Sequence, residues 1–77
     1  MKIHLTKPTV VGHGFNGARR YPIVWETGDW ESIGEWQNVG GAVNGYCYLN
    51  FRHASSGKTD SLKSHQVEEL KKIGLVH

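Results

Sequence analysis

The spacing of hydrophobic and polar positions changes along this chain, from the alternation of strands to a helical period near the C-terminus. Extended patterns occur at KIHL (2–5), YPIVWE (21–26), WESIGEW (30–36) and NGYCYLNF (44–51). Successive side chains of a strand point to opposite faces, so short runs of strand formers that alternate with polar residues predict half-buried strands. TGD at 27–29 is a turn signal, and we expect it to join 21–26 and 30–36 as a hairpin.

Glycine, proline and asparagine mark the expected connections. Pro8 ends the first strand, because proline cannot donate to a hydrogen-bond ladder. The segment GHGFNGARR (12–20) is predicted to be a loop, and HASSGKTD (53–60) a polar connection. Asn44-Gly45 is the strongest short-range hairpin signal, because both residues tolerate the positive φ of a type I′ turn.

The helical period begins after residue 60. Val67, Leu70 and Ile73 recur at helical spacing, which predicts a helix from Ser64 to about Ile73 with one apolar stripe. The candidate N-caps are Ser64 first, then Ser61 and Asp60. Because a helix this short is marginal alone, it must pack on the sheet.

The end of this helix carries a glycine signal. Gly74 stands where a C′ glycine is favoured, and Leu75 after it can contact Leu70, as in a Schellman motif. The whole pattern predicts an α+β fold in a single small globular domain, residues 1–77. It combines a small twisted antiparallel β-sheet of three to four strands, with the curl of an SH3-like barrel as one option, and one C-terminal α-helix.

Composition limits what such a domain can do. A chain of 77 residues buries about 60% of its unfolded surface, which leaves little room for a deep cleft. Its single cysteine, Cys47, excludes an internal disulfide and fits a reducing compartment. No apolar run approaches the roughly 20 residues that span a bilayer, and the N-terminus lacks the apolar block of a secretory signal. We therefore expect a cytoplasmic protein that does not enter a membrane.

Charge is nearly balanced in total but uneven along the chain. Nine Lys and Arg against seven Asp and Glu give a net charge of +2. Residues 1–25 carry bases without acids and residues 26–35 carry acids without bases. The bases are Lys2, Lys7, Arg19 and Arg20, and the acids are Glu26, Asp29, Glu31 and Glu35. The two blocks either steer partners through the field of the protein or pair with each other across strands.

The motifs that could carry chemistry each have a plainer structural explanation. GHGFNG (12–17) matches G-x-G-x-x-G, but the strand-like residues from Pro22 onward leave no helix to meet a phosphate. Cys47 shares a strand face with Leu49 and Phe51, as a core residue does. The five histidines show no close ligand spacing. The sequence therefore predicts no catalytic residue, cofactor or metal, and we expect a protein that is not an enzyme.

NGYCYLNF resembles the RNP1 strand of the RNA-recognition-motif family. The positions that match the pattern are Gly45, Tyr46, Tyr48, Leu49 and Phe51. Asn44 stands where Lys or Arg is usual, and Cys47 where Gly or Ala is usual. The resemblance covers eight residues, and the βαββαβ order of that family is missing. It implies that Tyr46 and Tyr48 stack on bases beside Arg52.

Tryptophan marks a competing surface. ETGDWESIGEW (26–36) places Trp30 and Trp36 among acids, shortly after Trp25. Tryptophan is enriched at interface hot spots because it removes much area from water while losing few rotamers. Either all three form an exposed patch, or Trp25 and Trp36 belong to the core and Trp30 alone is exposed. In both cases Trp30 is the expected anchor.

The leading hypothesis is a small non-enzymatic regulatory or inhibitory module that binds a protein partner. That partner could be a host enzyme or a nucleoprotein machine, as for accessory proteins of mobile elements. The expected protein-binding residues are Trp30, Glu26, Asp29, Glu31, Glu35, Arg19, Arg20 and Lys7. The alternative is a single-stranded RNA- or DNA-binding protein, with the contact residues Tyr46, Tyr48, Arg52, Arg19 and Arg20. The sequence leaves the oligomeric state open.

Overall fold

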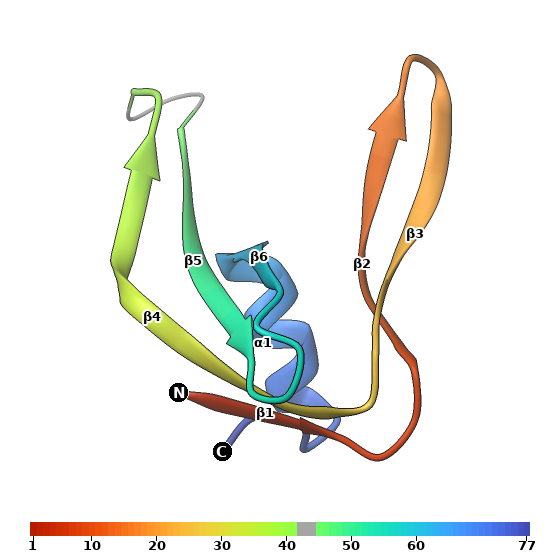
Figure 1. Cartoon of the computed structure of the whole chain (residues 1–77). Helices are drawn as coiled ribbons and strands as arrows, with labels where there is room; N and C mark the ends of the chain where they lie inside the picture. Colours follow the sequence, from red (N-terminus) through yellow and green to blue (C-terminus); the bar gives the residue numbers. More distant parts are fainter. Residues whose placement is uncertain (42–44) are drawn as a thin grey trace.

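The computed structural model describes residues 1–41 and 45–77 of the chain. Within these ranges the backbone forms six strands followed by one helix (Figure 1). The elements are β1 (Lys2–Leu5), β2 (Thr9–Asn16), β3 (Arg19–Trp25), β4 (Gly28–Val39), β5 (Tyr46–His53), β6 (Thr59–Lys63) and α1 (Ser64–Lys72). All paired strands are antiparallel. The predicted α+β class, a small antiparallel sheet with a C-terminal helix, is confirmed.

The strands belong to two sheets. A four-stranded sheet has the order β1-β4-β5-β6 and curls into a half-barrel, and β2 and β3 form a separate hairpin. Figure 1 shows the β2–β3 hairpin on one side of the molecule and the β4–β5 ribbon on the other, with α1 and β6 between them. The predicted turn at Asn44-Gly45 involves Asn44, which lies outside the described residues.

Two expectations about connectivity are wrong. Residues 12–20, expected as a loop, form the distal parts of β2 and β3 and the turn between them, where Gly17 has a φ of 63°. Residues 21–26 and 30–36 do not form a hairpin, because β3 pairs with β2 while β4 pairs with β1 and β5. At the bend between β3 and β4, Gly28 has a φ of 125°, which glycine adopts far more readily than other residues. This bend carries the chain from one sheet into the other.

β6 is a strand that the sequence pattern does not predict. The polar connection expected over residues 53–60 ends before Thr59, and Thr59–Lys63 is a strand although it is polar except for Leu62. Leu62 pairs with Leu49 of β5 and is fully buried. This edge strand is held by its pairing with β5, by the burial of Leu62 and by Asp60, whose carboxylate accepts the indole N–H of Trp25 at 2.9 Å.

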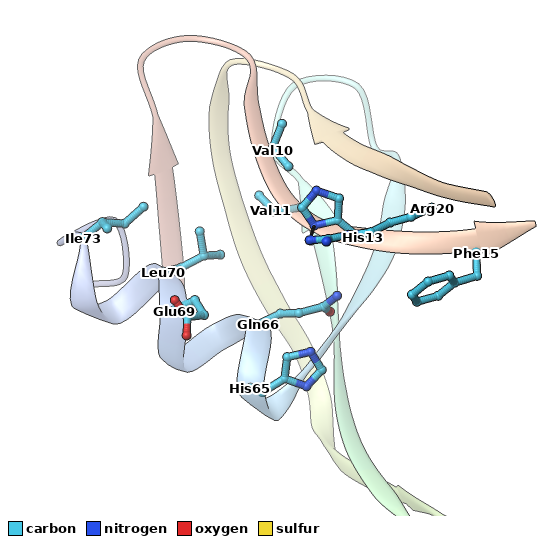
Figure 2. Close-up of a pocket in the computed structure, with 11 residues that line it drawn as sticks. Val10, Val11, His13, Phe15, Arg20, His65, Gln66, Glu69, Leu70 and Ile73 are labelled. Carbon is cyan, nitrogen blue, oxygen red and sulfur yellow. Dashed lines mark hydrogen bonds between the residues drawn. The ribbon is translucent and has the colours of Figure 1, made fainter. Parts of the chain in front are cut away.

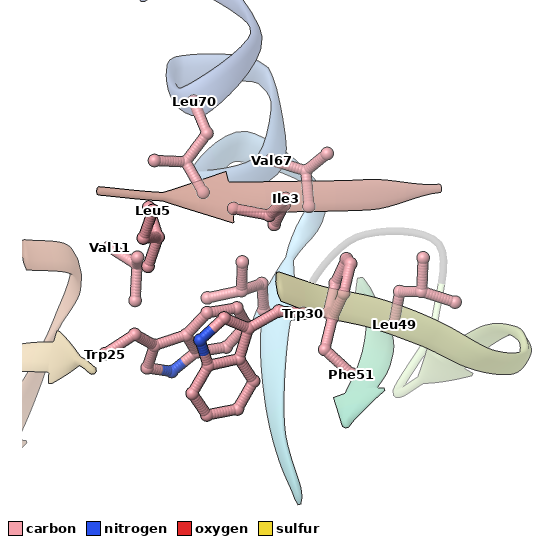
Figure 3. Packing of buried hydrophobic residues seen from close by; sticks show 10 residues of the cluster. Ile3, Leu5, Val11, Trp25, Trp30, Leu49, Phe51, Val67 and Leu70 are labelled. Atoms are coloured by element: carbon pink, nitrogen blue, oxygen red, sulfur yellow. The ribbon is translucent and has the colours of Figure 1, made fainter. Parts of the chain in front are cut away.

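The core lies between the inner face of the half-barrel, α1 and the base of the β2–β3 hairpin (Figure 3). Its buried apolar members are Ile3, Leu5, Val11, Trp25, Trp30, Leu49, Phe51, Leu62, Val67 and Leu70. The rings of Trp25 and Trp30 stack with centroids 4.1 Å apart, and Phe51 meets Trp25 edge-on at 5.6 Å. Such aromatic pairs contribute about 0.5–1.5 kcal/mol beyond the area they bury.

The expected exposure of Trp30 is wrong. Trp30 is only 3% exposed, and its indole N–H donates to the backbone oxygen of Glu26 at 3.1 Å. Trp36 is instead the exposed tryptophan of this segment, at 43%. Both occur on β4, but β1 pairs only with its first part, up to Glu31. Trp36 lies beyond that part, where fewer elements cover the ribbon.

The alternation predicted for β5 is confirmed except at Cys47, which is expected in the core but is only half-buried. Leu49, Phe51 and His53 are buried, whereas Tyr46 and Arg52 are exposed. The two faces of β5 therefore differ as the parity of its residues requires.

The N-terminal cap of α1 differs from the predicted one. The N-cap is Lys63, not Ser64, and Ser64 is the first helical residue. The backbone N–H of Lys63 donates to Oε1 of Gln66 at 2.8 Å, which satisfies a group that would otherwise lack a partner where β6 runs into the helix.

The C-terminal end of α1 follows the prediction. Gly74 has a φ of 79°, and the N–H of Leu75 donates to the oxygen of Leu70 at 3.1 Å. These features confirm the Schellman motif. Val67 is buried as expected, but Ile73 is 64% exposed, so the buried stripe ends at Leu70.

The last residues of the chain cover the outer edge of β1. The backbone groups of Lys2 and His77 exchange two hydrogen bonds, of 2.9 and 2.7 Å, and Val76 forms a bridge with Ile3. The two termini consequently lie side by side (Figure 1). In the described ranges, no helix combines the length and the apolar character needed to cross a bilayer.

Candidate functional site

A groove of about 510 Å³ separates β2 from α1 (Figure 2). Its β2 wall includes Val10, His13 and Phe15, and its helical wall includes His65 and Ile73. Figure 2 shows Phe15 at one end of the groove and Ile73 at the other. The volume lies within the range of about 300–1,000 Å³ that is typical of ligand sites.

The apolar residues of the groove are unusually exposed. Phe15 is 71% exposed and Ile73 is 64% exposed, the two largest values among the large hydrophobic residues outside 42–44. Val10 at the same groove is also exposed. The floor between them reaches Val11 and Leu70, which belong to the core. An apolar surface that joins the core in this way is a typical docking site.

The polar groups of the groove are mainly basic or neutral. The guanidinium of Arg20 donates to Nδ1 of His13 at 3.2 Å, so both residues occupy the β-hairpin wall together. Glu69 on α1 is the acid in the groove, and Lys72 lies 3.8 Å from its carboxylate. Within residues 1–41 and 45–77, Arg20 forms no ion pair. Its charge is therefore available to an acidic ligand.

α1 approaches β2 closely at a glycine. A Cβ atom at Gly12 would collide with the side-chain amide of Gln66. Gly12 thus lets the helix lie against the strand at one point, while the two diverge towards Phe15. Gly14 is covered by the ring of Tyr21 from β3, which any larger residue would displace.

The expected basic group does not form one surface. Arg19 and Arg20 lie at the tip of the β2–β3 hairpin, whereas Lys7 precedes β2 at the opposite end of the strand. Only Arg20 lines the groove. Of the residues proposed from the sequence for protein binding, Arg20 is therefore the one that the groove includes.

The acidic residues of 26–35 lie mostly in ion pairs of the half-barrel. Asp29 and Glu31 on β4 lie 3.9 and 3.8 Å from Nζ of Lys2 on β1, which is cross-strand pairing. Asp29 also accepts a hydrogen bond from Nδ1 of His4 at 2.6 Å. This hydrogen bond lowers the pKa of Asp29 below its ordinary 3.8, and the charge of Lys2 acts in the same direction. Glu35 is exposed further along β4.

The residues of the alternative nucleic-acid site lie on two separate parts of the molecule. Tyr46 and Tyr48 lie on the outer face of β5 with ring centroids 6.2 Å apart, and Nζ of Lys63 is 4.6 Å from the Tyr46 centroid. Arg52 shares this face, opposite Glu31 of β4. Arg19 and Arg20 do not, because they belong to the hairpin on the other side of the molecule (Figure 1).

A buried histidine cluster is a feature that the sequence does not indicate. His53 is buried, and its Nε2 donates to the backbone oxygen of Thr27 at 2.8 Å. Its Nδ1 lies 2.8 Å from Oγ of Ser56 and 3.1 Å from Oε1 of Glu26, and Ser56 in turn donates to Glu26 at 2.9 Å.

This geometry does not make a hydrolytic triad. In such a triad the nucleophile and the acid face opposite ring nitrogens of the histidine. Here Ser56 and Glu26 face the same nitrogen, and the other is occupied by the Thr27 carbonyl. The cluster instead fastens the bend before β4 to the turn after β5. The parity of His53 with Leu49 and Phe51 is the sequence signal that points to its burial.

The remaining reactive side chains have structural partners. The thiol of Cys47 donates to Oδ1 of Asn38 on the paired strand at 2.7 Å. Among the residues that the structure describes, no group of three or more His, Cys, Asp or Glu is placed to hold a metal ion. Comparison of the chain with protein-family models, with curated proteins and with solved structures finds no match.

Proposed function

We propose that this protein is a non-enzymatic binding module that recognises a protein partner through the groove between β2 and α1. The observation that carries the proposal is the exposure of Phe15 and Ile73 at the two ends of a groove whose floor is core. Burying a side chain of this size stabilises a complex by about 1.5–3 kcal/mol. Two such anchors supply about 3–6 kcal/mol, and further contacts along the groove must supply the rest of the cost of association.

The proposed role is regulatory or inhibitory, because the groove provides contact area and its described residues do not form a catalytic arrangement. The titratable groups at the groove are basic or already paired, and the histidine cluster around His53 lacks the arrangement of a charge relay. The proposal places the module in the cytoplasm, where a thiol such as that of Cys47 stays reduced.

The first experiment compares groove variants in a peptide selection. Random peptides displayed on phage are selected on the wild-type protein, and the enriched pool is then tested on a Phe15→Ser/Ile73→Ser double variant. We expect the pool to lose at least about tenfold in binding, which corresponds to about 1.4 kcal/mol.

The matched control is Val24→Ser. Val24 is also an exposed apolar residue of the β2–β3 hairpin, but it does not line the groove. Binding of the pool to this variant should equal binding to the wild type. Equal binding of the pool to the groove variant, or no enriched peptides at all, would contradict the proposal. Unfolding midpoints of all variants exclude loss of the fold as the cause.

A second candidate function, single-stranded nucleic-acid binding, is favoured by one observation. Tyr46 and Tyr48 present their rings on one outward face of β5, with the cation of Lys63 against one of them. Base stacking on such rings is worth about 1–3 kcal/mol per base. The net charge of +2 is low for a protein that contacts several phosphates.

This candidate is tested by titrating a mixed single-stranded oligonucleotide at low and moderate salt. Nucleic-acid binding predicts a salt-sensitive mobility shift that Tyr48→Ala abolishes. Absence of a mobility shift at tens of micromolar protein would exclude single-stranded nucleic-acid binding. The Phe15→Ser/Ile73→Ser variant should behave as the wild type here, because the two surfaces are separate.

A further inference from the structure

The two strands of the β2–β3 hairpin have very different free edges. In the part of the chain that the structure describes, these strands form a sheet of two, so each has one edge without a strand partner. A free edge exposes unpaired backbone groups and invites association, and proteins usually block it with charge or proline.

The free edge of β3 is blocked. Pro22 lies in the middle of the strand, opposite His13, and cannot donate a hydrogen bond to an added strand. Arg19 adds a charge in the same strand. Both devices are those by which natural proteins prevent edge-to-edge pairing.

The free edge of β2 has no such protection. Its sequence, TVVGHGFN, contains no Lys, Arg, Asp, Glu or Pro. Its distal half, from His13 to Asn16, extends beyond the contact of Gly12 with Gln66 of α1. Figure 2 shows α1 on the side of β2 that faces away from β3, so the groove runs along this open edge. An added strand could therefore form backbone hydrogen bonds with β2 and place side chains in the adjacent apolar groove.

We propose that the partner segment binds by strand addition to β2, as an extended peptide whose groove-facing side chains are apolar except for an acidic one beside Arg20. This inference rests on the proposed protein-binding function and specifies its mode. In strand addition the main chain supplies affinity and alternate side chains supply specificity. Every second side chain would face the groove beside Phe15. Because Arg20 pairs directly opposite Phe15, its guanidinium lies on the same face and would meet the acidic member of this set.

The distribution of charge favours a peptide from another protein over a second copy of the chain as the added strand. Antiparallel pairing of β2 with itself would bring Arg19 and Arg20 of one copy near Lys7 of the other, because these residues lie at opposite ends of the hairpin. Residues 1–25 contain no acid to offset this repulsion. An acidic segment from another protein removes it.

The test uses a defined probe, a blocked heptapeptide in which Ser alternates with one Glu and two Val residues, so that Glu and Val share one face. At about 3.3 Å per residue, an extended peptide of this length spans about 23 Å, which is enough to cover the open distal half of β2, four residues or about 13 Å. Binding is followed by amide chemical shifts and hydrogen exchange of the full chain. We expect alternate amides of β2 to gain protection, and the analogue with Lys in place of Glu to bind at least about tenfold more weakly.

N-methylated analogues separate strand addition from side-chain docking alone. Methylation should weaken binding at every second position, because only alternate N–H groups of an added strand face β2. Peptide binding without protection of β2 amides, or with equal tolerance of every N-methyl group, overturns strand addition but leaves the proposed function in place. Absence of heptapeptide binding also overturns strand addition, and the phage selection then decides the protein-binding function on its own. Concentration-dependent dimerisation with protection of β2 would identify a second copy as the occupant instead.

Discussion

Replacing each of two nearby tryptophans by alanine tests the assignment of the core. Trp30 and Trp36 both lie on β4 and have similar sequence surroundings. Trp30 is 3% exposed and Trp36 is 43% exposed. We expect Trp30→Ala to destabilise the protein strongly and Trp36→Ala to leave its stability nearly unchanged.

The magnitude follows from the contacts of Trp30. Its ring stacks on Trp25 at 4.1 Å, and its N–H donates to the oxygen of Glu26 at 3.1 Å. Truncation of a buried tryptophan to alanine costs about 3–5 kcal/mol. A domain of 77 residues has a total stability of about 4–12 kcal/mol. Trp30→Ala therefore removes a large part of the free energy of unfolding, whereas an exposed substitution stays within about 0.5 kcal/mol.

Urea and thermal unfolding monitored by far-UV circular dichroism provide the assay, because tryptophan fluorescence changes with the substitutions themselves. If Trp30→Ala does not fold, Trp30→Phe keeps an aromatic ring and loses the hydrogen bond, for an expected cost of about 1–2 kcal/mol. That corresponds to a decrease in Tm of roughly 4–16 °C. A Trp36→Ala variant that is destabilised as much as the Trp30 variants would refute the packing described here.

Two further predictions concern the bend before β4 and the ion pairs of β1. Gly28→Ala should cost about 1–3 kcal/mol in thermal unfolding, because the φ of 125° disfavours a side chain and the new Cβ would lie 2.6 Å from Nε2 of His53; an unchanged Tm would contradict this conformation. The lowered pKa of Asp29 stabilises the folded state above the ordinary value of 3.8, and this stabilisation is lost as pH falls through the folded pKa. The urea midpoint of Asp29→Asn should therefore lie below that of the wild type at pH 7 and approach it in acid, whereas parallel pH profiles would exclude this role for the carboxylate bonded to His4.

Local patterns were sufficient for much of the fold. The parity of β5 and the Schellman end of α1 follow from residue spacing and a well-placed glycine, so both could be predicted. The α+β class follows from the change of period along the chain. These features depend on neighbours within a few residues, and local sequence specifies them directly.

The candidate site was largely hidden from the sequence. Phe15 lies in a glycine-rich segment whose composition favours a loop, and the pairing of that segment with β3, where Phe15 lies opposite Arg20, makes it a strand. Ile73 has the helical spacing of a core residue, yet no other element covers it at the end of α1. Nothing in the local pattern indicates that these two residues line one groove.

By itself, the sequence determined the periodicity of the elements, the facing of residues within them and the balance of charge. The tertiary structure alone decided which strands pair, which of Trp30 and Trp36 is buried, and which hairpin edge lies open beside α1. The physical reason is that side-chain direction is set by local backbone geometry. Burial and pairing depend instead on contacts between distant segments. In this protein the bend at Gly28 separates the strands of the two sheets and so contributes to which segments meet.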